Sequence, residues 1–371
     1  MPELHALAFA GGLIVTALSL VVLYPFANRL GLIDRPKGRK QHTRPTPIIG
    51  GLAICAGAVI TTLMALHWGP PSLVTVLQQH IGYLLGALLL ALLGLWDDHS
   101  PVVARIKLFM QLFACVLAVM IDRAYIDDVA IRLGPVNLFL GPFALPFSIL
   151  VMLTITNGIN MIDGADGLSG GIIFIALTIM AKATMAAGFN SSLLIVALIG
   201  ALSAFLAVNL PWRPGKQALV FMGDCGTLVL GFTLAYFAIE LSSLPNRVFK
   251  PATALWFFFI PVADTIWLYL RRVWKARAPF AAGRDHVHHM LIDRIGATKA
   301  VWTLLAISAV LAGGAYLAER LWVRSIWLII AWIVAFGLYG LITHRAWLAA
   351  WHRRDIDCAE RPLAAEPASG T

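Results

Sequence analysis

The chain has 371 residues, of which 60% are hydrophobic and only 13% are charged, and its formal net charge is +9. A soluble globular domain carries about 25% charged residues, so this composition excludes an ordinary water-soluble protein. The positive charge would suit nucleic acid, but the basic residues gather in alternate loops, which is typical of membrane topology, and we expect no nucleic-acid partner.

Apolar runs recur along the chain at the length that crosses a bilayer, which is about 20 residues for a helix. The predicted spans are 5–26, 48–67, 80–96, 107–122, 137–156, 168–186, 190–210, 219–240, 252–270, 300–318 and 325–343. The sequence therefore predicts an all-α polytopic membrane protein with about 11 transmembrane helices. We expect one domain over residues 1–354, followed by a disordered cytoplasmic tail over 355–371, which is short, polar and rich in Pro and Ala.

The first run and the cysteines have simple interpretations. No basic residue precedes the first apolar run, so we interpret it as a retained span and not as a cleaved signal peptide. The four cysteines lack metal-binding spacing, and Cys55 and Cys115 fall inside predicted spans. We therefore expect the cysteines to be small buried apolar residues.

The distribution of Lys and Arg between the loops predicts the orientation. The loop after the first span contains six basic residues from Arg29 to Arg44, and the loop after the ninth contains seven from Arg271 to Lys299. The loops after the fourth, eighth and tenth spans carry two each, and the loop after the second carries none. Because basic residues concentrate in cytoplasmic loops, we expect the N-terminus outside and the C-terminus in the cytoplasm.

Four polar clusters fall on the predicted cytoplasmic side. They are GLWDDHS with Asp97 and Asp98, NGINMIDGADGLSGG with Asn160, Asp163 and Asp166, FMGDCGT with Asp224, and GRDHVHHML with His286, His288 and His289. Taken alone, each could be a solvated helix end, an ordinary turn or a solvated loop. The spacing of three between the polar residues of the second cluster would place neighbours side by side on a helix. Asp122, Asp127 and Asp128 fall on the other face, in a loop that could form a short hairpin.

Together, the clusters favour phosphoryl transfer. Carboxylates without thiolates suit a hard cation such as Mg²⁺ or Mn²⁺, held by one or two carboxylates and by substrate phosphates. Nearby Arg, Lys and His would neutralise the remaining phosphate charge. At a membrane surface, such a site could join a soluble phosphate compound to a lipid phosphate.

Two other classes of function are compatible with a polytopic chain. A transporter also carries ionisable groups in its spans, but its sites usually lie near the midplane of repeated halves, and no repeat is evident here. A noncatalytic scaffold would not require so many carboxylates on one face. The position of the acids at the ends of spans favours the transferase.

Five ordered motifs resemble the polyprenyl-phosphate N-acetylhexosamine-1-phosphate transferase family, glycosyltransferase family 4. They are DRPKGRKQHTRPTPIIGG (34–51), GLWDDHSPVVARIKLFMQ (94–111), NGINMIDGADGLSGG (157–171), NLPWRPGKQALVFMGDCGT (209–227) and GRDHVHH (283–289). The resemblance covers about residues 31–296. Eleven spans and an outside N-terminus are similar to the bacterial branch that makes undecaprenyl-diphospho-N-acetylglucosamine.

The resemblance implies a reaction in which UDP-N-acetylglucosamine donates its sugar-1-phosphate to undecaprenyl phosphate and UMP leaves. It implies Mg²⁺ as cofactor, with Mn²⁺ able to substitute, and membrane lipids as further partners. It also implies a multi-pass protein of the bacterial inner membrane, with the active site facing the cytoplasm, that starts O-antigen or related glycan synthesis. A homodimer, the donor epimer and the glycan pathway are left open.

The resemblance also implies roles for individual residues. The expected catalytic residues are Asp97, Asp98, Asp163 and Asp166, with Asp97 taking a proton from the lipid phosphate. The expected metal ligands are Asp224 and Asp98. The expected substrate-binding residues are Asn160, Asn209, Phe221, Lys107, Arg284, His286, His288 and His289. Some relatives have a further acid after the paired Asp, but HSP follows here, which weakens a three-carboxylate arrangement.

The motifs leave the mechanism open and give one indication of the donor. The lipid phosphate could attack directly, or an Asp could first form a covalent phospho-sugar enzyme. We favour direct attack, because the lipid phosphate already has a nucleophilic oxygen. The HxHH form of the last motif is similar to that found with N-acetylglucosamine donors, so we expect UDP-N-acetylglucosamine and not a muramoyl-peptide donor.

Overall fold

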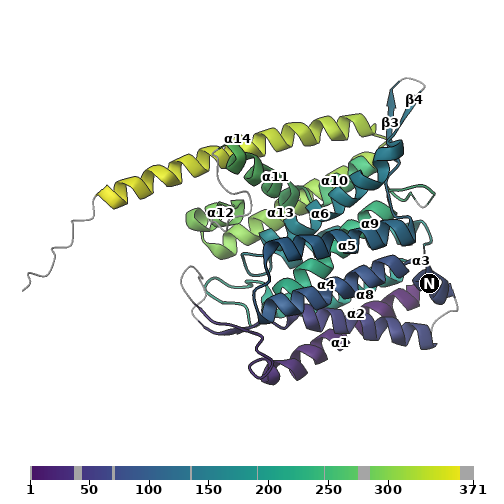
Figure 1. The fold of residues 1–371 in the computed structure, drawn as a ribbon, viewed down its shortest axis with the longest axis horizontal. Helices are drawn as coiled ribbons and strands as arrows, with labels where there is room; N and C mark the ends of the chain where they lie inside the picture. Colours follow the sequence, from purple (N-terminus) through teal and green to yellow (C-terminus); the bar gives the residue numbers. More distant parts are fainter. Residues whose placement is uncertain are drawn as a thin grey trace, which may run out of the picture.

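The computed structural model describes residues 2–36, 44–68, 72–133, 136–189, 191–245, 247–274 and 285–359. In this part the chain is mostly helical, and most of its long helices run roughly parallel to one another (Figure 1). In that view α1 lies along one edge and α14 along the opposite edge, and the β3–β4 hairpin projects from one end.

The first half of the chain contains several membrane-length helices and two short hairpins. Its elements are α1 (Pro2–Leu23), η1 (Tyr24–Phe26), β1 (Ile33–Asp34), β2 (Thr46–Pro47), α2 (Gly50–Trp68), α3 (Ser72–Gln79), α4 (Ile81–His99), α5 (Ala104–Asp122), β3 (Asp128–Leu133) and β4 (Val136–Phe139). Strand β1 pairs antiparallel with β2, and β3 with β4. The β3–β4 pair confirms the hairpin considered after the fourth predicted span, and its register is irregular between Asp128 and Arg132.

In the second half, the regular elements among the described residues are all helices. Its elements are η2 (Gly141–Phe143), α6 (Ala144–Ile162), α7 (Leu168–Ala186), α8 (Ser192–Asn209), α9 (Gly223–Glu240), α10 (Pro251–Phe257), α11 (Phe259–Trp274), α12 (Val287–Ile295), α13 (Ala297–Arg320) and α14 (Ser325–Ala359). Helices α10 and α11 meet at a bend of 82°, so the ninth predicted span is broken. Helix α14 continues past residue 354, where we expected the tail to begin.

The helices confirm a polytopic all-α membrane protein. Within the described ranges, nine helices are long and apolar enough to cross a membrane, or ten if α10 and α11 form one broken span. Helix α9, which matches the eighth predicted span, is not among them; it carries Asp224 and Glu240 near its two ends. The count of eleven and the sides on which the termini lie stay predictions.

The outer helices present apolar side chains to their surroundings. In the most apolar stretch of α14 only 17% of the residues are buried, compared with 78% in α8. Leu18 of α1 and Ile342 of α14 are mostly exposed. Such surfaces are unfavourable in water and match lipid acyl chains, because the helical backbone satisfies its own hydrogen bonds.

Helix α9 forms the centre of the bundle and positions the site. Its residues 225–239 are all buried, and it packs against α2, α4, α6 and α7. Gly94 lets α4 approach closely, because a Cβ at this position would lie 2.3 Å from Cys225 Cα. This approach places the end of α4, with Asp97 and Asp98, on the first turn of α9, which carries Asp224.

The cysteines lie inside this packing. Cys115 and Cys225 are buried, Cys55 is half-buried, and all three are free thiols. Their burial agrees with the expectation that they act as small apolar residues.

Candidate active site

Asp224, in the first turn of α9, is the centre of a network of polar side chains. Its Oδ2 accepts a hydrogen bond from Lys107 Nζ at 2.7 Å, and its Oδ1 accepts one from Asn160 Nδ2 at 2.6 Å. Lys107 Nζ also donates to Asp97 Oδ2. The network therefore joins the end of α4, the start of α5, the end of α6 and the start of α9.

The adjacent residues Asp97 and Asp98 have different environments. Asp98 accepts hydrogen bonds from the backbone N–H groups of Asp224 at 2.7 Å and Cys225 at 3.0 Å, one at each carboxylate oxygen. These N–H groups belong to the first turn of a helix, where no intrahelical acceptor exists, so Asp98 caps α9 from a neighbouring helix. Asp97 instead accepts from Lys107 and from the backbone N–H of Val102 at 2.6 Å. In this arrangement Asp98 positions Asp224, and its contact with a metal stays a prediction.

The NGINMIDGADG segment is only partly helical. Helix α6 ends at Ile162, so Asn160 is helical, whereas Asp163 and Asp166 lie in the turn that follows, and the side-by-side placement that the spacing would give on a helix does not extend beyond Asn160. Asp163 accepts a hydrogen bond from Ser169 Oγ, and Asp166 Oδ2 accepts one from the backbone N–H of Ala218 at 2.9 Å. The turn is thereby tied both to α7 and to the loop before α9.

The surroundings of Asp163 in this turn favour its protonated form. Burial is the main cause that raises the pKa of Asp163 to about 7; the charges of Asp224 and Asp166 act in the same direction, and the hydrogen bond from Ser169 acts against them. Asp163 is thus close enough to Asp224 to sense its charge. Its carboxyl group can gain or lose a proton near neutral pH.

The histidine cluster is anchored by Asp264 of α11, a residue that the sequence analysis missed. Asp264 Oδ2 pairs with His286 Nδ1 at 2.6 Å, and Oδ1 accepts from the backbone N–H of Val287 at 3.0 Å and from Tyr339 Oη at 2.6 Å. Asp264 is buried. The signal in the sequence was a lone acid in the apolar run 252–270, since an ionisable residue within a span normally has a partner or a function.

The histidine cluster also touches the turn after α6. A Cβ at Gly164 would lie 2.3 Å from His288 Nε2, so only glycine fits beside this ring. The ring centroids of His288 and His289 lie 4.1 Å apart. The structure therefore brings all four sequence clusters together, while Arg284 lies outside the described residues.

The loop before α9 is held by Asn209 and Phe221. Asn209 Oδ1 accepts from the backbone N–H of Gly167 at 2.7 Å, and its Nδ2 donates to Val220 O at 2.7 Å. Phe221 donates its backbone N–H to Pro47 O at 2.8 Å, which joins the 34–51 motif to the site. Both ends of the Asn209 amide are thus engaged within the chain, and direct contact of either residue with a substrate stays a prediction.

Comparison with known proteins gives the family. Residues 80–242 match glycosyl transferase family 4. The undecaprenyl-phosphate alpha-N-acetylglucosaminyl 1-phosphate transferase of Haemophilus influenzae is 31% identical over 341 residues, which cover 91% of this chain and 94% of the relative. The chain belongs to glycosyl transferase family 4. Transferases with the same name from Yersinia pestis and Escherichia coli are 30% identical over 334 residues and 28% identical over 338, covering 89% and 90% of each chain.

Family membership confirms the resemblance read from the motifs. The matched segment 80–242 contains Asp97, Asp98, Lys107 and Asp224, so the network described above lies within the part of the chain that defines the family. This glycosyl transferase is a multi-pass membrane protein, and its polar network lies at one end of its apolar helices.

The donor atoms of this family-4 site are of the kind that a hard cation prefers. In the part of the chain that the structure describes, no group of three or more His, Cys, Asp or Glu side chains could hold a metal ion alone. Mg²⁺ needs only one or two carboxylates when substrate phosphates complete its shell. The Asp224 side chain is 29% exposed, so its oxygens can reach such a ligand. The carboxylate and amide oxygens around it, without thiolates, suit Mg²⁺ or Mn²⁺.

Proposed function

We propose that this protein transfers N-acetylglucosamine-1-phosphate from UDP-N-acetylglucosamine to undecaprenyl phosphate. The products are undecaprenyl-diphospho-N-acetylglucosamine and UMP. The observation that carries the proposal is the convergence of Asp97, Lys107, Asn160 and Asp224 at one end of the helices. The three relatives compared above carry the name of an enzyme that acts on undecaprenyl phosphate and N-acetylglucosaminyl 1-phosphate.

In this reaction an oxygen of the lipid phosphate attacks the phosphorus that carries the sugar. The bond from that phosphorus to the oxygen of UMP breaks, so the lipid product keeps one phosphate from each substrate. Asp97 takes the proton of the lipid phosphate, and the backbone N–H of Val102 holds its carboxylate in place. Lys107 supplies a cation that can move from its two carboxylate partners to phosphate oxygens.

The cation that this chemistry requires is Mg²⁺ or Mn²⁺. When bound, it neutralises charge on the diphosphate. Asp224 is its principal holder in this proposal, because the carboxylate is partly exposed and is fixed by Asn160. Asp98 supports it through the two N–H groups that begin α9. The carboxylates of Asp97, Asp98, Asp163, Asp166 and Asp224 lie at this end of the bundle, and a dication would offset the repulsion among them.

The metal requirement has a direct test. EDTA should abolish UMP release by purified protein, and added Mg²⁺ or Mn²⁺ should restore it. Full activity in metal-free buffer, with the remaining metal measured by elemental analysis, would contradict the assignment.

The donor is proposed to be UDP-N-acetylglucosamine, on the basis of the HxHH segment. Asp264 and Tyr339 fix His286, and Gly164 lets His288 lie against the Asp163 turn. A site that reads hydroxyl and acetamido groups by hydrogen bonds rejects donors that leave its polar groups unpaired. Competing UDP-sugars at equal concentration, with the lipid products identified by mass, test this. Preference for a muramoyl-peptide donor or for a dideoxy sugar would contradict it.

The proposal places the site on the cytoplasmic side of the bacterial inner membrane, where sugar nucleotides are made. Cysteine labelling in a cysteine-free background tests this placement. A label at Ser72 should react from outside intact cells, and a label at Arg277 should react only after permeabilisation. The reverse pattern would separate the histidines from the cytosolic donor and contradict the mechanism.

The whole proposal is tested with purified protein, UDP-N-acetylglucosamine, undecaprenyl phosphate and Mg²⁺. We expect UMP and the lipid diphosphate sugar in equal amounts, with neither formed when undecaprenyl phosphate is omitted. Movement of substrate across vesicles without UMP release would instead indicate a transporter.

A further inference from the structure

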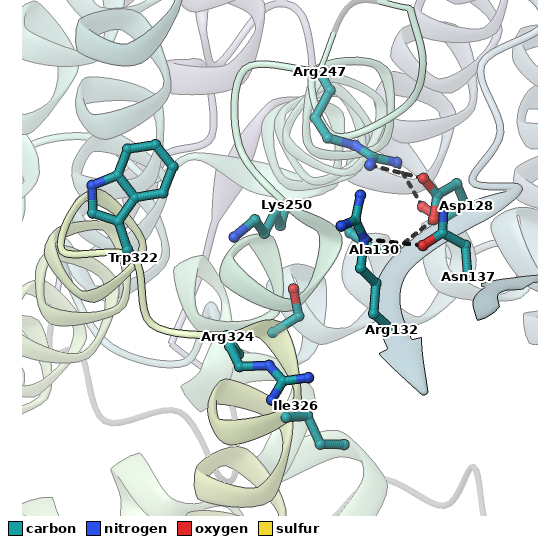
Figure 2. Close-up of a pocket in the computed structure, with 10 residues that line it drawn as sticks. Asp128, Ala130, Arg132, Asn137, Arg247, Lys250, Trp322, Arg324 and Ile326 are labelled. Carbon is teal, nitrogen blue, oxygen red and sulfur yellow. Dashed lines mark hydrogen bonds and ion pairs between the residues drawn. The ribbon is translucent and has the colours of Figure 1, made fainter. Parts of the chain in front are cut away.

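A second polar site lies at the other end of the bundle. A cavity of about 480 Å³ is bounded by the β3–β4 hairpin, the segment before α10 and the start of α14 (Figure 2). Helix α9 begins at the Asp224 network and ends shortly before this cavity, and its 18 residues rise about 27 Å. The cavity is therefore separated from the active site by about the thickness of the hydrocarbon core.

Basic side chains dominate the lining of this cavity. Arg132, Arg247, Lys250 and Arg324 line it, with Asp128 as the one carboxylate. The three loops that supply these residues carry only two basic residues each, so four of the six face one cavity. The charge bias between loops disfavours basic residues on this side, and their gathering indicates a function other than topology.

Two of these four cations are already engaged and two are available. Arg247 donates from Nη1 to Asp128 Oδ2 at 3.0 Å, and Arg132 donates from Nε to Asn137 Oδ1 at 3.1 Å, as Figure 2 shows. No hydrogen bond or ion pair reaches the Lys250 ammonium or the Arg324 guanidinium from any described residue. These two groups can therefore receive an anion without breaking an existing contact.

A buried hydroxyl points independently to a ligand. Ser325 lines the cavity and is 4% exposed, and its Oγ has no hydrogen-bond partner among the residues that the structure describes. A buried polar atom without a partner is unfavourable, and a ligand oxygen in the cavity would satisfy it. Ser325 is also the first residue of α14, where the helix dipole favours negative charge.

We propose that this cavity binds a phosphate group through Lys250, Arg324 and Ser325 Oγ, with the Arg247–Asp128 pair as a fixed wall. The cavity lies at the start of α14, a helix of membrane length, and the end of such a helix is expected near the lipid headgroups. Trp322, which also lines the cavity, is 89% exposed, as is typical of a residue at the membrane–water interface. The expected source of the phosphate is therefore the headgroup of an anionic phospholipid in the leaflet opposite the active site.

The test uses the full-length protein with two probes, phosphatidylglycerol and inorganic phosphate. Phosphatidylglycerol is titrated into phosphatidylcholine nanodiscs and retained lipid is counted by native mass spectrometry. Inorganic phosphate is titrated in detergent and read by thermal unfolding. The variant K250Q/R324Q is compared with R123Q/R320Q, which removes two charges from the same face without touching the cavity lining.

We expect K250Q/R324Q to bind about tenfold or more weakly and R123Q/R320Q to bind like the wild type, because charge-assisted hydrogen bonds are lost only in the first. Ser325→Ala should weaken binding severalfold without lowering the unfolding temperature of the ligand-free protein, which keeps the test decisive if the double variant folds poorly. Saturation by phosphatidylglycerol identifies a lipid source, and saturation by inorganic phosphate alone identifies a free anion. Equal binding by both double variants and by Ser325→Ala, or no saturable binding of either probe to the wild type, overturns the proposal.

Discussion

The two ends of the bundle both carry aspartates, but they hold them in different ways. At the active-site end, Asp97 and Asp224 share the ammonium of Lys107, and Asp224 is partly exposed. At the opposite end, Asp122 accepts two backbone N–H groups at the start of α4, at 2.6 and 2.7 Å, and Tyr236 Oη at 3.0 Å. Asp128 is paired with Arg247.

This difference distinguishes aspartates that stabilise the fold from aspartates that can exchange a lysine for another cationic partner. A carboxylate whose oxygens accept backbone N–H groups fixes a helix end, whereas one shared with a lysine can exchange that lysine for a substrate. By this criterion Asp98 resembles Asp122, although it lies at the active-site end, because each caps the first turn of a neighbouring helix. Substitutions at these aspartates and at Lys107 test that division.

The largest effect is expected for Asp224→Asn, which keeps the shape of the side chain but removes its charge. Activity should fall roughly 100-fold or more, the loss typical of a strong electrostatic contact in the transition state. The rate of UMP release measures it, and far lower expression or a shifted elution profile would show misfolding instead. Asp127→Asn is the matched control, since Asp127 lies at the other end and accepts a bond from Gly141, and its activity should stay near that of the wild type.

Substitution of either paired aspartate should lower enzymatic activity, but only Asp98→Asn should clearly lower the stability of the protein. Asp98→Asn leaves an N–H group of α9 facing an amide NH₂, so the free energy of unfolding should fall by about 1–3 kcal/mol along with activity. Asp97→Asn should lose a comparable amount of activity with a smaller fall in unfolding temperature, because the amide oxygen can still accept from Val102 and Lys107 keeps its contact with Asp224. Thermal unfolding in detergent distinguishes the two variants. Equal stability of Asp97→Asn and Asp98→Asn would contradict the capping role of Asp98.

Asp122→Asn tests the same distinction at the end of the bundle opposite the active site. It should lower the unfolding temperature as Asp98→Asn does, since it also breaks a cap, but turnover per folded molecule should be near normal. A large loss of turnover in this variant would mean that capping and catalysis are not separable by these contacts.

Lys107→Gln should lower activity about 10- to 100-fold, because it removes a charge-assisted contact to the phosphates. The exposed Lys182 of α7 gives a control of the same chemistry, and Lys182→Gln should behave like the wild type. Equal rates for both variants would show that Lys107 only balances charge in the resting protein.

Smaller effects on enzyme kinetics are expected for substitutions at Asp264 and at its partner Tyr339. Asp264→Asn should raise the KM for the sugar nucleotide about tenfold, because the carboxylate no longer orients His286, whereas kcat should change less. Tyr339→Phe removes one of the three bonds to Asp264 and should cost only about two- to threefold. Steady-state kinetics measures both, and an equal fall in kcat without a change in KM would place His286 in the chemical step instead.

The sequence predicted the features that depend on local pattern. Apolar runs of membrane length predicted most of the helices, and polar motifs at the ends of those runs predicted which residues gather at the site. The sequence predicts Asp97, Asp163 and Asp224 at one end, because Asp97 and Asp163 follow predicted spans, Asp224 lies near the start of another, and successive spans alternate in direction across the membrane.

The features that the sequence did not predict depend on distant segments. The partner of Asp98 is a helix start more than a hundred residues away, and no local pattern indicates it. Asp264 is a lone acid in an apolar run, and its role is evident only from His286 and Tyr339, which approach from other helices. Helix α6 also begins and ends later than the predicted span, because the hairpin takes up its expected first residues and the helix continues through Asn160.

The central claim is that this site moves a sugar together with its phosphate, and a donor labelled separately in its two phosphates tests it most directly. With the wild-type protein, undecaprenyl phosphate and Mg²⁺, label in the phosphate next to the sugar should appear in the lipid product, and label in the phosphate next to uridine should appear in UMP. Asp224→Asn should reduce both signals together. Release of UDP with an unlabelled lipid product, or full transfer by Asp224→Asn, would contradict this account of the site.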